Sequence, residues 1–565
     1  MKILKFAIGL CLGLVLIVMP LSQFQSSNLD ALETLVVQQG GRKKPLDTVA
    51  QETVAKIHGA TTYQHDGVRE SSMETFLSLW LNNRNWNEEP FVLVSYRPLK
   101  ERVGLAVDQK YFSFQTLMRN GALGEVVRSA HEKQLNDEDL TRDEREALTL
   151  EDRLTLMLGM VSDDAIAIVP HPTDPKGKWL GITEGQTLYS PEAIAPLIAN
   201  FALIKQTVFS GVSHLPMVNP LAASLKSGLA ELSPQVYPAD ATMRREVFFN
   251  HFHPFAKAWQ LYGIAFVVML AALLIKPFEA YWSAIGLFVA GVAVQAYGFW
   301  ERMQIAGRPP VTNMYESVVW VGFGIAAIAL TFELIYRSKY YLLAAAPLSV
   351  VCLILADSLP AVLDPSISPL VPVLRDNFWL SIHVPTIALS YASFALALGL
   401  GHVALGSYLF TPNAKKRIQL LSQLNYRVLQ VGVLLLTAGI ILGGIWAHFS
   451  WGRFWGWDPK ETWALIALLC YLIPLHGRLV GWIGNFGISV ASVVAFNAVL
   501  MAWYGVNFVL GTGLHSYGFG TGGSELLIVG VVGADLLFVL IAAARHRGWL
   551  LKLGSLLSRP EPQSN

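Results

Sequence analysis

Cysteine and charge are both scarce in this chain, and each shortage excludes a class of protein. The three cysteines lie inside apolar runs and form no C-x-x-C pair, which excludes a disulfide framework and a thiolate metal site. Charged residues make up only 15% of the chain, whereas soluble domains carry about a quarter. A net charge of +1 argues against a nucleic-acid partner. Because 53% of the residues are hydrophobic, the composition is typical of a membrane protein.

Long apolar segments account for this composition. A helix needs about 20 apolar residues to cross the hydrocarbon layer of a membrane, and we predict an all-α polytopic membrane protein with about ten transmembrane helices. The first is either an uncleaved anchor or a signal peptide, and the lack of a clear small-x-small cleavage site favours the anchor. The ten segments are centred in 4–22, 258–275, 280–299, 317–335, 341–357, 378–405, 428–447, 462–481, 486–504 and 525–544.

The chain divides by composition into four parts. Residues 1–22 form the predicted N-terminal anchor or signal peptide, and residues 256–545 form the polytopic part. Between them, residues 23–255 hold most of the charge, including a run at 131–153 that is typical of a solvated helical face. We predict that residues 23–255 fold as a mixed α+β extracytoplasmic domain. Residues 546–565 form a basic cytoplasmic tail.

Cationic residues predict the orientation of the spans, because cytoplasmic loops carry an excess of Lys and Arg. With a cytoplasmic N-terminus, every cationic cluster falls in an inner loop, and both termini lie in the cytoplasm. The loops 448–462 and 506–523 and the segment 376–385 then share the outer face with the domain 23–255. The inner clusters contain Lys276, Arg337, Lys339, the segment 412–427, Arg478, Arg545, Arg547 and Lys552.

Tryptophan is concentrated at one place. Five of the 16 tryptophans lie within residues 446–463, which contain the stretch "WGRFWGWDPKETW". An aromatic belt at the membrane–water interface would explain a single tryptophan but not this density. Gly452 and Gly456 leave bare backbone beside the rings, which permits the close approach of something flat. We interpret the rings as a platform for a large planar ligand. Asp458, which precedes a proline, also fits a helix cap.

Three of the thirteen histidines stand out by their predicted positions. His383 and His515 fall on the predicted outer face, one before the tryptophan segment and one after it. Two neutral imidazoles on opposite sides of a flat macrocycle are what bis-histidine haem ligation needs. His476 lies about fourteen residues into the eighth span, roughly 20 Å below the outer surface. It is therefore a functional candidate, unless Pro474 and Arg478 mark the inner interface there.

Four separated motifs together resemble a known family. "WGRFWGWDPKETWALI" closely resembles the tryptophan-rich WWD signature of the haem-handling proteins. "GRPPVTNMYESVVW" at 307–320, "WLSIHVPTIALSYASF" at 379–394 and "GVNFVLGTGLHSYGF" at 505–519 resemble its CcsA (ResC) branch, which belongs to cytochrome c biogenesis system II. The resemblance covers residues 256–545, and residues 40–59 resemble an extracytoplasmic extension of the longer members.

The resemblance also implies roles for particular residues. His383 and His515 match the two outer-face histidines that ligate the haem iron. His476 matches an intramembrane haem site, whose second histidine comes from the CcsB (ResB) subunit in this family. The signature that holds haem is matched by Trp451, Trp455, Trp457 and Asp458.

The implied function is a subunit of a cytochrome c synthase (haem lyase) complex in the cytoplasmic membrane. Haem b is carried to the outer site and presented to apocytochrome c, whose C-x-x-C-H cysteines form thioethers with the haem vinyl groups. Because the span 4–22 contains no histidine, we expect the chain to need a separate CcsB-type partner. The chemistry is positioning rather than acid–base catalysis.

Three other functions stay open. A system I haem-delivery or ligase protein belongs to the same superfamily, although the long soluble domain and "GLHSYG" favour system II. A quinone- or ion-binding membrane transporter would use His476, Glu301, Glu316 and Arg308 as intramembrane polar groups, but it leaves the tryptophan platform unexplained. A scaffold that recruits partners would be colourless when purified.

Overall fold

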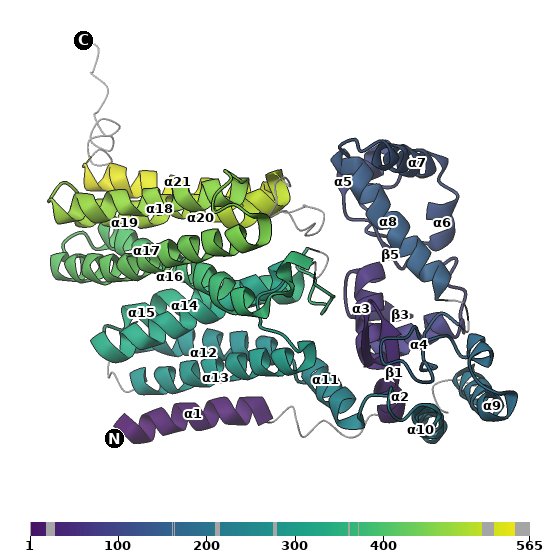
Figure 1. Cartoon of the computed structure of the whole chain (residues 1–565). Coiled ribbons are helices and arrows are strands. Elements are labelled where there is room, and N and C mark those ends of the chain that lie inside the picture. Colours follow the sequence, from purple (N-terminus) through teal and green to yellow (C-terminus); the bar gives the residue numbers. More distant parts are fainter. Residues whose placement is uncertain are drawn as a thin grey trace, which may run out of the picture.

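The computed structural model consists of a helical bundle (α1 and α12–α21) with a second, mainly helical part beside one of its ends (Figure 1). We call this second part the N-terminal domain (residues 29–252). Each part has its own large hydrophobic core. The structure describes residues 2–18, 29–160, 162, 164–209, 215–274, 280–359, 362–370, 372–510 and 525–548.

Apolar helices form the bundle. Among the described residues, nine stretches are long and apolar enough to cross a membrane, counting α11 together with α12 and α19 together with α20 and η5. The apolar part of α1, Lys5–Ile17, is shorter. The predicted all-α polytopic fold is confirmed. The bundle helices are α1 (Lys2–Val18), α12 (Pro254–Leu274), α13 (Tyr281–Ala306), α14 (Met314–Tyr336), α15 (Tyr340–Ser358), α16 (Asn377–Phe410), α17 (Lys415–Trp451), α18 (Pro459–Leu479), α19 (Asn485–Val494), α20 (Phe496–Leu500), the π-helix η5 (Met501–Leu510) and α21 (Glu525–His546).

Helix α1 packs closely on α13 through small residues. A side chain at Gly9 would collide with the backbone of Ser283, and one at Gly286 would collide with the backbone of α1. The Ser283 hydroxyl donates to the carbonyl oxygen of Lys5 at 3.1 Å. Small residues that let two backbones approach are typical of helix pairs inside membranes. This packing joins α1 to the bundle through α13.

The described residues of the N-terminal domain are mainly helical and form three two-stranded antiparallel sheets with short strands. Capping boxes begin two of its helices: Ser71 with Glu74 at α4, and Thr141 with Glu144 at α8. Its strands are β1 (Val36–Gln39), β2 (Arg42–Pro45), β3 (Thr62–His65), β4 (Val68–Ser71), β5 (Val92–Leu93) and β6 (Tyr111–Phe112). Its helices are α2 (Asp30–Glu33), α3 (Leu46–His58), α4 (Ser72–Trp80), α5 (Arg97–Arg102), α6 (Phe114–Met118), α7 (Gly121–Leu135), α8 (Arg142–Gly159), η2 (Glu184–Thr187), α9 (Pro191–Phe209), α10 (Leu215–Leu232) and α11 (Asp240–Phe252).

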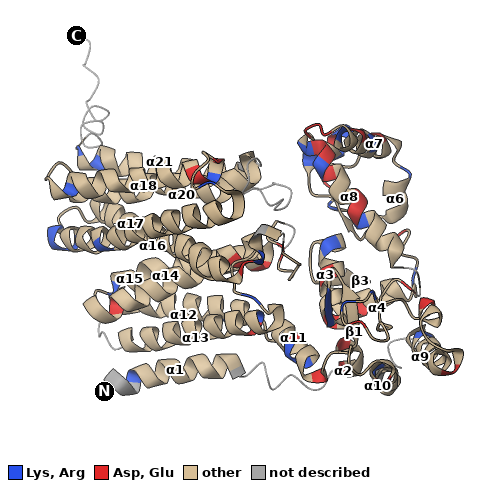
Figure 2. Cartoon of the chain, in the orientation of Figure 1, with Lys and Arg blue, Asp and Glu red and all other residues tan. Residues whose placement is uncertain are grey.

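The two ends of the bundle differ in charge. One end faces the N-terminal domain, and we call it the domain end; the opposite one is the far end (Figure 1). Figure 2 shows Lys and Arg gathered at the far end, where α17 begins and α18 and α21 end. The turns α13–α14, α15–α16 and α17–α18 all lie at the domain end.

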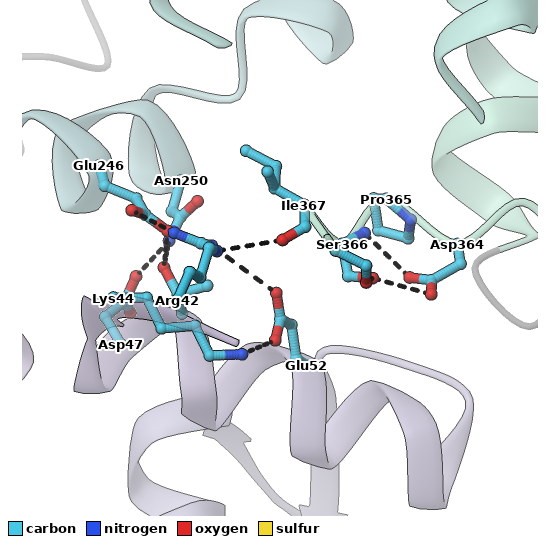
Figure 3. Close-up of polar contacts among 12 residues, drawn as sticks. Arg42, Lys44, Asp47, Glu52, Glu246, Asn250, Asp364, Pro365, Ser366 and Ile367 are labelled. Carbon is cyan, nitrogen blue, oxygen red and sulfur yellow. Dashed lines mark hydrogen bonds and ion pairs between the residues drawn. The ribbon is translucent and has the colours of Figure 1, made fainter. Parts of the chain in front are cut away.

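Arg42 links the N-terminal domain to the connection between α15 and α16 of the bundle (Figure 3). The guanidinium of Arg42, on β2, donates to both carboxylate oxygens of Glu246, on α11, at 2.9 and 2.7 Å. It also donates to the carbonyl oxygen of Ile367 at 3.1 Å. Ile367 belongs to the connection between α15 and α16, residues 362–370, which we call the strap. Gly41 packs directly against Pro369 of the same strap.

The strap in turn contacts the α13–α14 turn. Arg302, on α13, donates to the carbonyl oxygen of Pro365 at 2.7 Å. The side-chain amide of Asn313 lies 3.3 Å from the carbonyl oxygens of Asp364 and Ser366. The strap therefore connects the N-terminal domain with the residues that begin α14.

Candidate ligand-binding cavity

A large cavity opens at the domain end, between α14, α16, α17, α18 and η5. About 1290 Å³ of space between its lining residues holds no protein atom, and this volume includes the open solvent at its mouth. Its lining is mainly apolar, and six aromatic side chains contribute to it: Tyr391, Trp446, Trp451, Phe454, Trp455 and Trp503. The cavity therefore offers flat apolar surface on which a planar molecule could stack.

His383 lies in the wall of this cavity, in the second turn of α16. Its Nδ1 is 2.9 Å from the carbonyl oxygen of Gly439, on α17. Because a carbonyl only accepts, Nδ1 carries the hydrogen, and Nε2 carries the lone pair of the neutral ring. This is the arrangement that orients histidines which bind metals. His383, which the sequence predicted as a metal ligand, thus has the tautomer that would let Nε2 bind a metal ion.

Glycines on α17 make room for that imidazole. A side-chain carbon at Gly443 would lie 2.5 Å from Cε1 of His383, closer than such atoms approach. At Gly444, an added carbon would meet the ring of Phe454 at 2.6 Å. The sequence analysis missed these residues, although the pattern "TAGIILGG" within an apolar span was a visible sign of close packing.

The tryptophans predicted as one platform divide into two groups. Trp451, at the end of α17, and Trp455 line the cavity together with His383. Trp457 is not part of the cavity lining, and its side chain is 69% exposed. It contacts Trp455 edge to face, with ring centroids 5.8 Å apart at 88°. Trp457 also has a φ of 57°, an unusual conformation for a bulky residue that is typical of functional sites.

Asp458, Gly452 and Gly456 shape the turn between α17 and α18 and do not line the cavity. The Asp458 carboxylate caps α18 and accepts from the backbone N–H of Lys460 at 2.9 Å, as the cap interpretation predicts. Gly452 ends α17 in the left-handed conformation, with a φ of 69°. The space beside Gly456 is filled by the guanidinium of Arg453. The bare backbone that we interpreted as ligand-facing therefore serves the loop itself.

The π-helix η5 supplies the last wall of the cavity. Trp503 and Asn507 both line it from successive turns. Wide π turns are rare in proteins and often occur at functional sites. The predicted ligand His515 follows this helix in sequence and lies outside the described residues.

His476 lies far from the cavity, in the last turn of α18. At 1.5 Å per residue it is about 25 Å along the helix from Pro459. Its Nδ1 is 2.9 Å from the carbonyl oxygen of Leu472, so the lone pair again falls on Nε2. The imidazole is exposed on the bundle surface, beside the exposed apolar side chains of Leu469 and Ile473. The structure does not bring His476 together with His383.

The cavity wall at the α13–α14 turn rests on a buried ion pair. Arg302 donates to Glu316 at 2.5 Å, and both side chains are almost fully buried. Glu316 also accepts from the backbone N–H and the hydroxyl of Thr312, at 2.7 and 2.6 Å. Val311, which precedes Thr312 and lies in the cavity lining, has a φ of 75°, a strained conformation for a β-branched residue.

The sequence analysis left open a membrane transporter that would use Glu301, Glu316 and Arg308 as intramembrane polar groups. In the structure, each of these side chains has a polar partner at or near the α13–α14 turn. Glu316 is paired with Arg302, and Arg308 donates to the Thr312 hydroxyl at 3.3 Å. Burial lowers the pKa of the Arg308 guanidinium. Glu301 lies 3.6 Å from Arg245, on α11. These contacts join loops and helix ends to one another.

The fold and the cavity define a class of protein: a polytopic membrane protein with an aromatic-walled cavity at one end of its bundle. Comparison with known proteins identifies the family. Residues 311–515 match the model of the family described as Cytochrome C assembly protein. The chain is 36% identical over 310 residues to Cytochrome c biogenesis protein CcsA of Synechococcus sp. (strain CC9902), covering 47% of this chain and 98% of that protein. It therefore belongs to the CcsA-type family of cytochrome c biogenesis proteins, which confirms the predicted resemblance.

Two further similarities concern longer or more distant proteins. The chain is 30% identical over 505 residues to Protein NrfI of Wolinella succinogenes, covering 86% of this chain and 54% of NrfI. It thus spans about half the length of that relative. A solved structure, Cytochrome c Heme Lyase CcmF, matches 55% of this chain and 51% of its own with 17% identity and a TM-score of 0.35. A TM-score this low does not establish a common fold.

Proposed function

We propose that this chain binds haem b in the cavity at the domain end and presents it for covalent attachment to apocytochrome c. One observation carries the proposal: the Nδ1–H of His383 is held by the Gly439 carbonyl, in a cavity walled by tryptophans. A neutral imidazole with its lone pair on Nε2 is the usual protein ligand of haem iron.

The other properties of the cavity suit the same ligand. Among the described residues, no group of three or more His, Cys, Asp or Glu side chains could hold a metal ion without further ligands. Haem needs no such group, because its macrocycle supplies four of the ligands to the iron and the protein supplies the axial ones. His383 would be one axial ligand, and we propose His515 as the other. Trp451 and Trp455 would provide stacking area for the macrocycle.

In the proposed reaction, thioether formation between the apocytochrome and haem, the chain acts by holding the haem in position. Each cysteine thiol of the apocytochrome adds its sulfur and its hydrogen across one haem vinyl double bond, so the chain supplies no acid or base. What the chain contributes is a ligated iron and a fixed orientation of the macrocycle, which converts a bimolecular encounter into a near-intramolecular one. The histidine of the C-x-x-C-H segment can then take the place of a protein ligand on the iron.

We propose that the cavity and the N-terminal domain lie on the outer side of the cytoplasmic membrane. The far end carries the clustered Lys and Arg residues (Figure 2), and such clusters favour the cytoplasmic side. The domain end would then meet the compartment in which the apocytochrome arrives. The N-terminal domain, fastened by Arg42 and the strap, would stand beside the mouth of the cavity.

His476 would belong to a second haem site that this chain shares with a CcsB (ResB)-type subunit. Its exposed imidazole has the lone pair on Nε2, and its neighbours on α18 are exposed and apolar. A surface of this kind suits a partner helix that brings a second histidine. We propose that haem passes from this site to the cavity.

Absorption spectroscopy of the purified chain tests the proposal. We expect a Soret band in the wild type and its loss or strong reduction in His383→Ala, because the iron loses its ligand. Added imidazole should restore the band, since it replaces the missing side chain without repairing anything else. His448→Ala is a matched control, because His448 is exposed near the same end of α17 and does not line the cavity. Equal haem content in the wild type and His383→Ala would contradict the proposal.

A further inference from the structure

Lys460 is the cationic residue in the described part of the cavity lining. It lies in the first turn of α18, directly after the cap Asp458 and Pro459. Its Nζ donates to the side-chain oxygen of Asn507, on η5, at 3.1 Å. A positive charge in a cavity with mainly apolar and aromatic walls calls for an explanation, because burying an unpaired charge is costly.

The neighbouring carboxylates do not neutralise this charge by direct contact. Glu461 accepts from the backbone N–H groups of Gly456 and Asp458, at 2.8 and 3.2 Å, and lies 3.8 Å from the Arg453 guanidinium. Asp458 accepts from the backbone N–H, and not the ammonium, of Lys460. In the part of the chain that the structure describes, no carboxylate lies within 4.0 Å of the Lys460 ammonium.

Asn507 strengthens the case that this position is built for a ligand. Its side-chain amide donates to the carbonyl oxygen of Trp503 at 2.7 Å, so its oxygen is turned to Lys460. The ammonium carries three donors, and one is used by Asn507. The lysine is therefore held in place from η5, within the cavity wall, with donor capacity left over.

We infer that Lys460 binds a carboxylate of the planar ligand and thereby sets its orientation in the cavity. This inference rests on the proposed function, in which the ligand is haem. Haem b carries two propionate carboxylates at one edge and its vinyl groups on the other pyrrole rings. Fixing the propionate edge at Lys460 decides where the vinyl groups point, which His383 cannot do, because rotation about an axial bond leaves ligation unchanged.

The test compares haem with haem dimethyl ester, in which both propionates are esterified and uncharged. The purified full-length chain is titrated with each compound while the Soret band is followed. We expect the wild type to bind haem about tenfold more tightly than the ester, because a hydrogen bond between charged groups is lost with the ester. In Lys460→Met this preference should disappear, with the affinity for the ester unchanged.

Two controls separate a binding role from a structural one. Lys460→Arg should keep the preference for haem, since it keeps the charge. Lys416→Met removes an exposed lysine at the far end and should also keep it. If Lys460 only supported the fold, Lys460→Met would weaken the binding of both compounds, and that outcome would overturn the inference.

The remaining outcomes distinguish this inference from the proposed function. A wild type that binds haem and the ester equally would overturn the role of Lys460 and leave haem binding intact. A preference for haem that persists in Lys460→Met would do the same. A wild type that binds neither compound would contradict the proposed function itself, and this inference with it.

Discussion

His383 and His476 have the same local chemistry in different surroundings. Each is held through Nδ1 by a main-chain carbonyl at 2.9 Å, and each therefore has the lone pair on Nε2. His383 lies in an aromatic cavity formed entirely by this chain, whereas His476 is exposed on the surface of α18. The two histidines therefore share a tautomer and differ in their surroundings. On the proposed function, these surroundings make one site complete within this chain and the other dependent on a second chain.

The two histidines also differ in how they are held. The carbonyl partner of His476 belongs to Leu472, on its own helix, one turn earlier. The partner of His383 is Gly439, on a neighbouring helix, and Gly443 makes the close approach possible. The orientation of His383 therefore depends on the packing of α16 against α17, while that of His476 depends on α18 alone. Three comparisons between variants test how the cavity and the surface of α18 differ.

The largest effect is expected from Gly443→Leu. The added side chain would occupy the space of the His383 ring and push the imidazole from its position. We expect the haem affinity of the cavity to fall by about 100-fold, close to 3 kcal/mol. Gly406→Ala is the control, because a side chain there meets nothing within 4 Å. Soret titration of both proteins measures the difference, and an unchanged affinity in Gly443→Leu would show that His383 does not ligate from this position.

A smaller effect separates two adjacent tryptophans. Trp455 lines the cavity and Trp457 does not, although only one residue lies between them. We expect Trp455→Ala to lose stacking area and weaken haem binding by about tenfold. Trp457→Ala should stay within about twofold of the wild type. Soret titration of both variants measures their haem affinities. An equal loss of affinity in the two variants would mean that the tryptophans act as a single platform.

The smallest effect is expected from His476→Ala in the chain studied alone. The cavity should keep its haem affinity within about twofold, because His476 contributes nothing to its walls. When a CcsB-type subunit is co-expressed, the same variant should lower the total haem content of the complex. A loss of haem from the isolated chain would instead indicate that the two histidines belong to one site.

Much of this organisation could be predicted from sequence, because it depends on local composition. Apolar length identified the spans, which the structure confirms as helices. The Asp-Pro step predicted the cap of α18, since an N-cap uses only residues within one turn. The density of tryptophan pointed to the segment that closes the cavity, and predicted topology placed His383 near it.

Other parts of the site could not be predicted in this way. Lys460 looked like a charged residue at the start of a span, and its place in the cavity depends on Asn507, 47 residues later. Arg302 and Glu316 lie in different helices, and their pairing beside the strained Val311 is a contact between helices. Trp457 could not be separated from Trp455, because a positive φ reverses the direction of one side chain without leaving a trace in composition.

The sequence by itself determined which segments become apolar helices, where they begin, and to which family the chain belongs. These properties follow from hydropathy, capping and motif order, all of which act over short distances along the chain. Only the tertiary structure decided that Trp451, Trp455, Lys460 and His383 face one cavity while Trp457 and His476 do not. The reason is physical: the direction of a side chain depends on which helices pack together, and that packing is set by contacts between residues far apart in the chain.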